Sequence, residues 1–163
     1  MKIINLLKVS AVLLIGVLML TGCSDKKKEI SLQDMKALSK SHALVVAYND
    51  GTVRTYDDKG IKPLFRHIAG FGDFKGAYVF DKVTGKASAL VLAYGGAEKL
   101  YTGVLSKEAI PVLEKYNIAY DADQIVDFIH NMTGDDACPM EKSVNKLEEP
   151  EEAYKVLKER FNK

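Results

Sequence analysis

The chain has 163 residues, of which 47% are hydrophobic and 28% are charged, and its formal net charge is +1. This composition excludes a largely disordered chain, which needs fewer apolar residues, and a nucleic-acid binder that depends on bulk positive charge. A chain of this length can bury a hydrophobic core without disulfide bonds or metal ions. We therefore expect one globular domain, preceded by a segment of different character.

Residues 1–22 have the features of a bacterial signal peptide. Lys2 and Lys8 are followed by an uncharged run, Val9–Leu20, which is too short to span a bilayer comfortably. The run ends in Leu20–Cys23 (LTGC), which resembles the lipobox of bacterial lipoproteins. The resemblance implies cleavage before Cys23 and attachment of lipid to its thiol, with several acyl chains because one chain anchors only marginally. We therefore expect a membrane-bound lipoprotein of the cell envelope.

The residues after the lipobox refine this expectation. Ser24, rather than an aspartate, follows Cys23, and by resemblance to lipoprotein sorting this favours the outer membrane in a cell that has one. In a cell with one membrane, the expected place is the outer face of the plasma membrane. Lys26–Lys28 either touch anionic headgroups or form a solvated tether. With Cys23 acylated, Cys138 is the only other cysteine, so no intrachain disulfide is expected.

The hydrophobic pattern predicts alternating helices and strands from residue 31 onwards. Ser31 and Asp34 have the spacing of a capping box and predict a short helix. The apolar strand Ala43–Tyr48 leads through a turn into the strand Thr52–Tyr56, which predicts a hairpin. The further elements expected are a helix at Ile61–Ala69, a strand at Ala77–Val83, a helix at Gly85–Tyr94, a strand at Leu100–Leu105, a helix with Ala109, Val112, Leu113 and Tyr116 on one face, a short strand at Ile118–Tyr120, and helices near Gln124–Met132, Pro139–Leu147 and Glu151–Phe161.

This order predicts an α/β fold with a mixed sheet of about five strands and helices on both faces. The chain divides into a signal peptide at 1–22, a lipidated cysteine with tether and short helix at 23–41, and an α/β domain with C-terminal helices at 42–163.

Several short motifs occur together in an order that resembles a known family. They are Gly60–Leu64 (GIKPL), Asp81–Ala87 (DKVTGKA), Leu92–Gly96 (LAYGG), Cys138–Lys142 (CPMEK) and Glu149–Tyr154 (EPEEAY). From about Leu44 to Leu157, the chain resembles Domain of Unknown Function 1893, an uncharacterised prokaryotic family. The resemblance implies a three-layer, cytidine-deaminase-like fold.

The chain departs from zinc deaminases at the metal ligands. In those enzymes one crossover helix opens with His-x-Glu or Cys-x-Glu and the next with Pro-Cys-x-x-Cys, which together hold a zinc-bound hydroxide and a proton-shuttling Glu. Here the corresponding helices open with Gly60–Pro63 and Thr84–Ala87, which offer no thiolate, imidazole or carboxylate. We therefore expect no metal and no other cofactor.

If the deaminase arrangement holds, two helix amino termini converge on one cleft and attract anions. Lys62 and Lys86 would then stand where metal ligands stand in deaminases, with Asp81 and Lys82 at the preceding strand end and Gly85 in the turn. These positions predict binding of a small anionic or nucleobase-like ligand through Lys62, Lys82, Gly85 and Lys86. The alternative is that the lysines form a solvated rim.

A second hypothesis is a metal-independent enzyme. A proline follows Cys138, which places the cysteine at a helix N-cap where its thiolate is favoured, although two preceding aspartates oppose this. Cys138 or Lys86 would act as nucleophile, general base or substrate orienter, with Asp81 or Glu141 assisting. This hypothesis requires Cys138 or Glu141 to share the cleft of Lys86; otherwise Cys138 is a packed cap residue.

The remaining polar and aromatic residues predict no further site. His42, His67 and His130 lack the spacing of metal ligands, and His67 is expected at the surface or the core boundary. Basic and aromatic residues are not interleaved, so no nucleic-acid partner is expected. The sequence carries no signal of oligomeric state.

Overall fold

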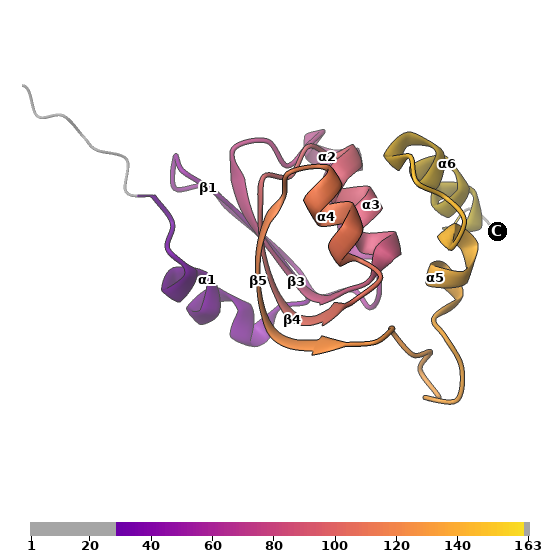
Figure 1. Cartoon of the computed structure of the whole chain (residues 1–163). Helices are drawn as coiled ribbons and strands as arrows, with labels where there is room; N and C mark the ends of the chain where they lie inside the picture. Colours follow the sequence, from indigo (N-terminus) through magenta and orange to yellow (C-terminus); the bar gives the residue numbers. More distant parts are fainter. Residues whose placement is uncertain (1–28, 162–163) are drawn as a thin grey trace, which may run out of the picture.

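The computed structural model describes residues 29–161, so the predicted signal peptide, Cys23 and the lysine tether lie outside the described residues. Its centre is a sheet of five strands in the order β2-β1-β3-β4-β5 (Figure 1). The strands are β1 (Leu44–Tyr48), β2 (Val53–Tyr56), β3 (Ala77–Thr84), β4 (Lys99–Ser106) and β5 (Ala119–Val126). β1 is antiparallel to β2 and β3, whereas β3, β4 and β5 are parallel. The predicted mixed sheet is therefore confirmed.

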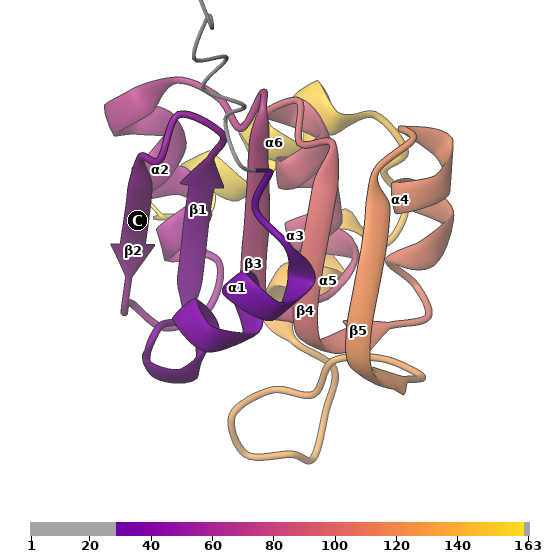
Figure 2. The same ribbon diagram turned by 90° about the vertical axis from the view of Figure 1, so that its left-hand side faces the viewer.

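Helices cover the two faces of the sheet unequally (Figures 1 and 2). One face carries α2 (Lys62–Phe71), α3 (Lys86–Tyr94), α4 (Ile110–Lys115), α5 (Pro139–Val144) and α6 (Pro150–Phe161). The other face carries only α1 (Leu32–Leu38) and the short 3₁₀ helix η1 (Ser39–Ser41) among the described residues. Within residues 29–161, none of the helices has the length and apolar character needed to cross a bilayer. The layers agree with the predicted three-layer α/β arrangement.

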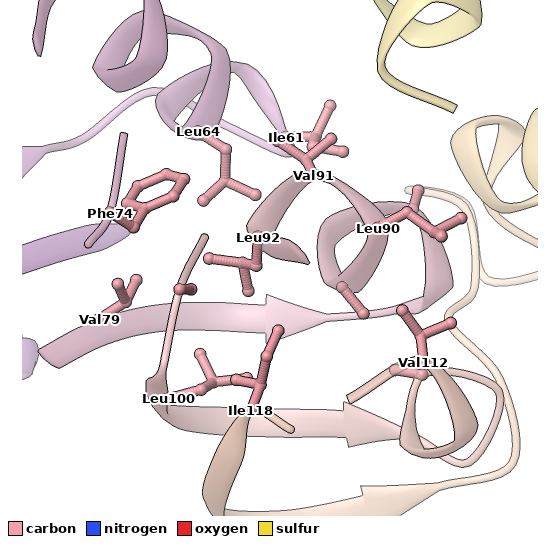
Figure 3. Close-up of a cluster of buried hydrophobic side chains, with 14 of the residues drawn as sticks. Ile61, Leu64, Phe74, Val79, Leu90, Val91, Leu92, Leu100, Val112 and Ile118 are labelled. Carbon is pink, nitrogen blue, oxygen red and sulfur yellow. The ribbon is translucent and has the colours of Figure 1, made fainter. Parts of the chain in front are cut away.

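The main core lies between the sheet and α3, which is the most deeply buried helix (Figure 3). Every residue from Ala87 to Leu92 is buried, because the sheet lies on one side of α3 and α5 and α6 pack on the other. Leu90 and Leu92 are fully buried and pack with Phe74 and Val79 in this core. A helix that is apolar all round needs such complete enclosure.

A smaller core lies under α1, on the other face. Met35 of α1 is fully buried among Val45, Tyr78, Phe80 and Tyr101. The predicted capping box begins this helix: Asp34 N donates to Ser31 Oγ over 3.1 Å, and Ser31 N donates to Asp34 Oδ2 over 3.0 Å. The short helix therefore packs directly on the sheet.

The helix predicted near Gln124–Met132 is wrong. β5 continues to Val126 and pairs with β4 as far as Ser106, and residues 127–138 contain no helix. The segment after β5 closes on itself, since Asn131 N donates to Asp136 O over 2.8 Å. Pairing with a distant strand overrides the local helix-like spacing of the apolar residues.

The expectation that His67 lies at the surface or boundary is also wrong, because the side chain is fully buried. Its Nδ1 lies 3.0 Å from the Tyr56 hydroxyl, and its Nε2 lies 3.1 Å from the Tyr48 hydroxyl and 3.0 Å from Asp73 O. The ring stacks on Phe74 with centroids 4.7 Å apart. Burial lowers the pKa of His67. The histidine therefore connects α2 to the β1–β2 hairpin.

Candidate functional site

The amino end of α3, where the sequence predicts an anion site, is filled by a carboxylate of the chain itself. Glu141 of α5 accepts hydrogen bonds from Lys86 N over 2.8 Å and from Ala87 N over 3.1 Å. The residue is only 7% exposed. Unpaired amides at a helix start are the groups that bind external anions. In this structure Glu141 therefore takes the position that the sequence assigns to a ligand.

Gly85 makes this close approach possible. It is the N-cap of α3 and has extended backbone, with φ −102° and ψ −173°, which other residues also adopt. A Cβ at this position would lie 2.3 Å from Glu141 Oε1. The glycine predicted to contact a ligand instead provides space for the Glu141 carboxylate.

The Lys86 side chain reaches the segment between α5 and α6. Its Nζ donates to Asn145 O over 2.9 Å and lies 3.5 Å from Glu148 Oε1. Backbone and side chain of Lys86 thus both hold the C-terminal helices against the start of α3.

Asp81 belongs to a buried polar cluster beside this helix start. Thr84 Oγ1 lies 3.1 Å from Asp81 Oδ2 and 3.0 Å from Thr102 Oγ1, and all three residues are buried. Burial raises the pKa of Asp81 to about 7, although hydrogen bonds from Thr84 and Ser88 act in the opposite direction. Asp81 therefore exchanges its proton near neutral pH.

The other predicted ligand-binding lysines do not join this cluster. Lys62 is exposed at the start of α2, and within residues 29–161 no hydrogen bond or ion pair connects it to Lys86 or Glu141. Lys82 is exposed and lines a hollow beside η1, on the face of the sheet that carries α1. The predicted cleft of converging lysines is therefore not assembled in this form.

Cys138 is the N-cap of α5, as predicted, and is partly exposed. Its backbone N donates to Ile129 O over 2.8 Å, but its side chain makes no capping hydrogen bond. Glu141, three residues later, has the spacing of a capping box but reaches across to α3 instead. The structure thus brings Glu141, but not the Cys138 thiol, into hydrogen-bond contact with Lys86.

The groups at the start of α3 do not fit the zinc ion of deaminases. The segment Thr84–Ala87 offers no ligand side chain of the deaminase type, and both oxygens of Glu141 already accept amide hydrogen bonds. Over the described part of the chain, no three His, Cys, Asp or Glu residues are grouped so that they could hold a metal ion.

An apolar groove, not anticipated from the sequence, lies at the carboxyl ends of β3, β4 and β5. It has a volume of about 480 Å³ and is lined by Val83, Val104 and residues 125–130; we call it the edge groove. Ligands of open α/β sheets bind at this end of the parallel strands. Val83, Ile125 and Phe128 are apolar but exposed. The sequence shows that they are apolar, but it does not show that they are exposed, and so it did not indicate the groove.

A second hollow lies between η1 and the sheet. Its volume is about 390 Å³, and its lining includes Lys40, His42, Lys82, Gly103 and Asp123; we call it the basic hollow. His42 pairs with Asp57 at 2.8 Å and Asp123 with Lys36 at 3.1 Å. Asp57 also lines the hollow, and within residues 29–161 Lys40 and Lys82 are the charged lining residues that form no ion pair.

Comparisons with known proteins identify the family. The family model described as Domain of unknown function (DUF1893) matches residues 33–161. The crystal structure of a DUF1893 family protein from Thermotoga maritima is similar, with a TM-score of 0.75 and 25% sequence identity over 82% of this chain and 91% of that chain. A search of curated proteins finds no match. The family match covers most of the chain, and the chain therefore belongs to the DUF1893 family.

Proposed function

We propose that this chain is a lipid-anchored binding protein of the cell envelope, which takes a small ligand with a planar, nucleobase-like part into the edge groove. The observation that supports this proposal most directly is the position of the groove at the carboxyl ends of β3, β4 and β5. Its volume of about 480 Å³ lies within the range typical of small-molecule sites.

The lining of the groove favours a planar ligand. Phe128 and His130 have ring centroids 4.5 Å apart and form an aromatic wall, and Phe128 is 39% exposed. Val83, Val104 and Ile125 are the apolar residues that line the same groove. A flat, partly polar ring gains most from such a lining, because it stacks on aromatic faces while its edge keeps hydrogen bonds to water or to His130.

Binding of ribonucleosides to the purified protein, followed by NMR chemical shifts, tests this proposal. We expect shifts confined to the edge groove, and we expect Ile125→Asp to weaken binding about tenfold or more, because it places a charge against the apolar ligand. Ile125 is 52% exposed, so the substitution leaves the core intact. Val156→Asp is the matched control, since Val156 is 37% exposed on α6. Absence of binding for every nucleoside would contradict the proposal.

The alternative is an enzyme that uses Cys138 or Lys86, with Asp81 or Glu141 assisting. The contact between Glu141 and the Lys86 amide favours it, because shared location is what this alternative requires. Against it, both Glu141 oxygens are engaged by amides, and neither the edge groove nor the basic hollow is lined by these four residues. Nucleoside binding that is unchanged in Cys138→Ser supports the binding function, and its loss supports the alternative.

A further inference from the structure

The edge groove and the basic hollow adjoin because the alternation of β3 is interrupted. In a regular strand, residues three apart point to opposite faces. Asp81 and Thr84 nevertheless share a hydrogen bond on the α3 side of the sheet. Of the two residues between them, Lys82 lines the basic hollow and Val83 lines the edge groove.

The same interruption occurs in β4. Thr102 contacts Thr84, and Leu105 belongs to the main core, so both point towards the helices that carry that core. Between them, Gly103 lines the basic hollow and Val104 lines the edge groove. A Cβ on Gly103 would lie 3.0 Å from Lys82 O, a tight contact with the backbone of β3, so the two strands approach each other closely here. The two hollows are therefore neighbours along both strands.

The basic hollow is lined by two carboxylates that have partners, Asp57 with His42 and Asp123 with Lys36, and by two lysines that have none among residues 29–161. Lys40 and Lys82 are both exposed, and neither forms an ion pair with any residue in the 29–161 range. The carboxylate of Asp123 is already engaged by Lys36 and by the Tyr101 hydroxyl. Two free ammonium groups lining one hollow attract a group with negative charge on several oxygens.

We propose that the edge groove and the basic hollow together bind a planar molecule that carries a phosphate group. The planar part lies against Phe128 and Ile125, and the phosphate binds between Lys40 and Lys82. This inference rests on the proposed function and specifies its ligand class as nucleoside monophosphates or molecules of the same shape and charge. The amides at the start of α3 do not compete for the phosphate, because they already bind Glu141.

Titration calorimetry on the purified protein tests the inference with the four ribonucleosides, their 5′-monophosphates and inorganic phosphate as probes. We expect a monophosphate to bind about tenfold or more tightly than its nucleoside, since charge-assisted hydrogen bonds of the phosphate add to the contacts of the base. Lys82→Gln should remove most of this difference and leave nucleoside binding unchanged. Lys62→Gln is the control, because it removes the same charge from an exposed position outside both hollows.

The outcomes separate this inference from the proposed function. Equal affinity for nucleoside and monophosphate overturns the phosphate site but leaves the edge groove as a binding site. The phosphate site is also overturned if Lys82→Gln and Lys62→Gln reduce the preference for the monophosphate equally. The preference would then come from the net charge of the protein. Binding of inorganic phosphate at Lys82 without any nucleoside binding overturns the edge groove instead. No binding of any probe overturns both.

Discussion

Asp81 makes the stability of the folded domain depend on pH. Its carboxyl is buried, and burial raises its pKa from 3.8 to about 7. The folded chain therefore holds a proton on Asp81 at pH values where the unfolded chain has released it. By linkage, this group lowers the stability of the folded state as pH rises from about 4 to about 7, and its effect is constant above that range.

We predict that Asp81→Asn removes this contribution. The difference in unfolding free energy between variant and wild type should grow in favour of the variant by up to about 1.4 kcal/mol for each pH unit in the window, and then level off. Urea denaturation followed at several pH values measures it. His67, whose pKa is lowered by burial, has the opposite effect below its ordinary pKa, but it is present in both proteins and cancels in the difference. A difference that stays flat across the window would contradict a buried, protonated Asp81.

Contacts within one helical turn were predictable from the sequence, whereas contacts between distant segments were not. The capping box of Ser31 and Asp34 spans three residues and is confirmed, because both partners lie in one turn. Glu141 has the same local spacing from Cys138, yet its partners are the Lys86 and Ala87 amides, 55 and 54 residues away in the chain. The packing of α5 on α3 determines which amides the Glu141 carboxylate binds. The sequence alone does not show this packing.

At the scale of elements, strands and helices with uniform burial were predictable. β1 is apolar along its whole length and α3 from Ala89 to Tyr94, and both elements match the predicted ranges closely. β5 was predicted too short, and its end was assigned to a helix, because Ile125 and Phe128 have helix-like spacing but are exposed at the carboxyl edge of the sheet. An edge strand is determined by the partner it pairs with, so its own residues predict it poorly.

The contact between α3 and α5 gives a prediction at this scale. Gly85→Ala should destabilise the fold by about 1–3 kcal/mol, because its Cβ would lie 2.3 Å from Glu141 Oε1 and displace this buried carboxylate from the Lys86 and Ala87 amides. Chemical denaturation measures the loss, and hydrogen exchange should be faster in α5. Gly70→Ala is the control, since nothing lies within 4 Å of its Cβ. In the double variant Gly85→Ala, Glu141→Ala the two losses should not add, because the same contact is removed twice. Additive losses would place the strain elsewhere.

At the scale of the whole molecule, the unequal covering of the sheet explains where the hollows lie. Figure 2 shows α1 in front of the β1, β3 and β4 strands and no described helix in front of β5. A helix of 7 residues is only about 10 Å long, too short to cover the sheet face from edge to edge. Val83 and Ile125, near the carboxyl ends of β3 and β5, are 39% and 52% exposed. The sequence predicts the shortness of α1, but the part of the sheet that it leaves open depends on how the helix packs.

Cys23 is the residue through which we expect the molecule to be attached to a membrane. Cys23→Ser removes the thiol that the lipobox-like sequence offers for lipidation, so we expect the variant to incorporate no labelled palmitate and to move from the membrane fraction to the soluble fraction. Each buried CH₂ of an acyl chain contributes about 0.8 kcal/mol to membrane binding, and stable anchoring needs more than one chain. A variant that carries no acyl chain loses all of this binding energy. Cys138→Ser is the matched control, because Cys138 is the only other cysteine and lies in the folded domain. Palmitate labelling that persists in Cys23→Ser, or that is lost in Cys138→Ser, would overturn the lipoprotein assignment while leaving the edge groove to be judged by its own test.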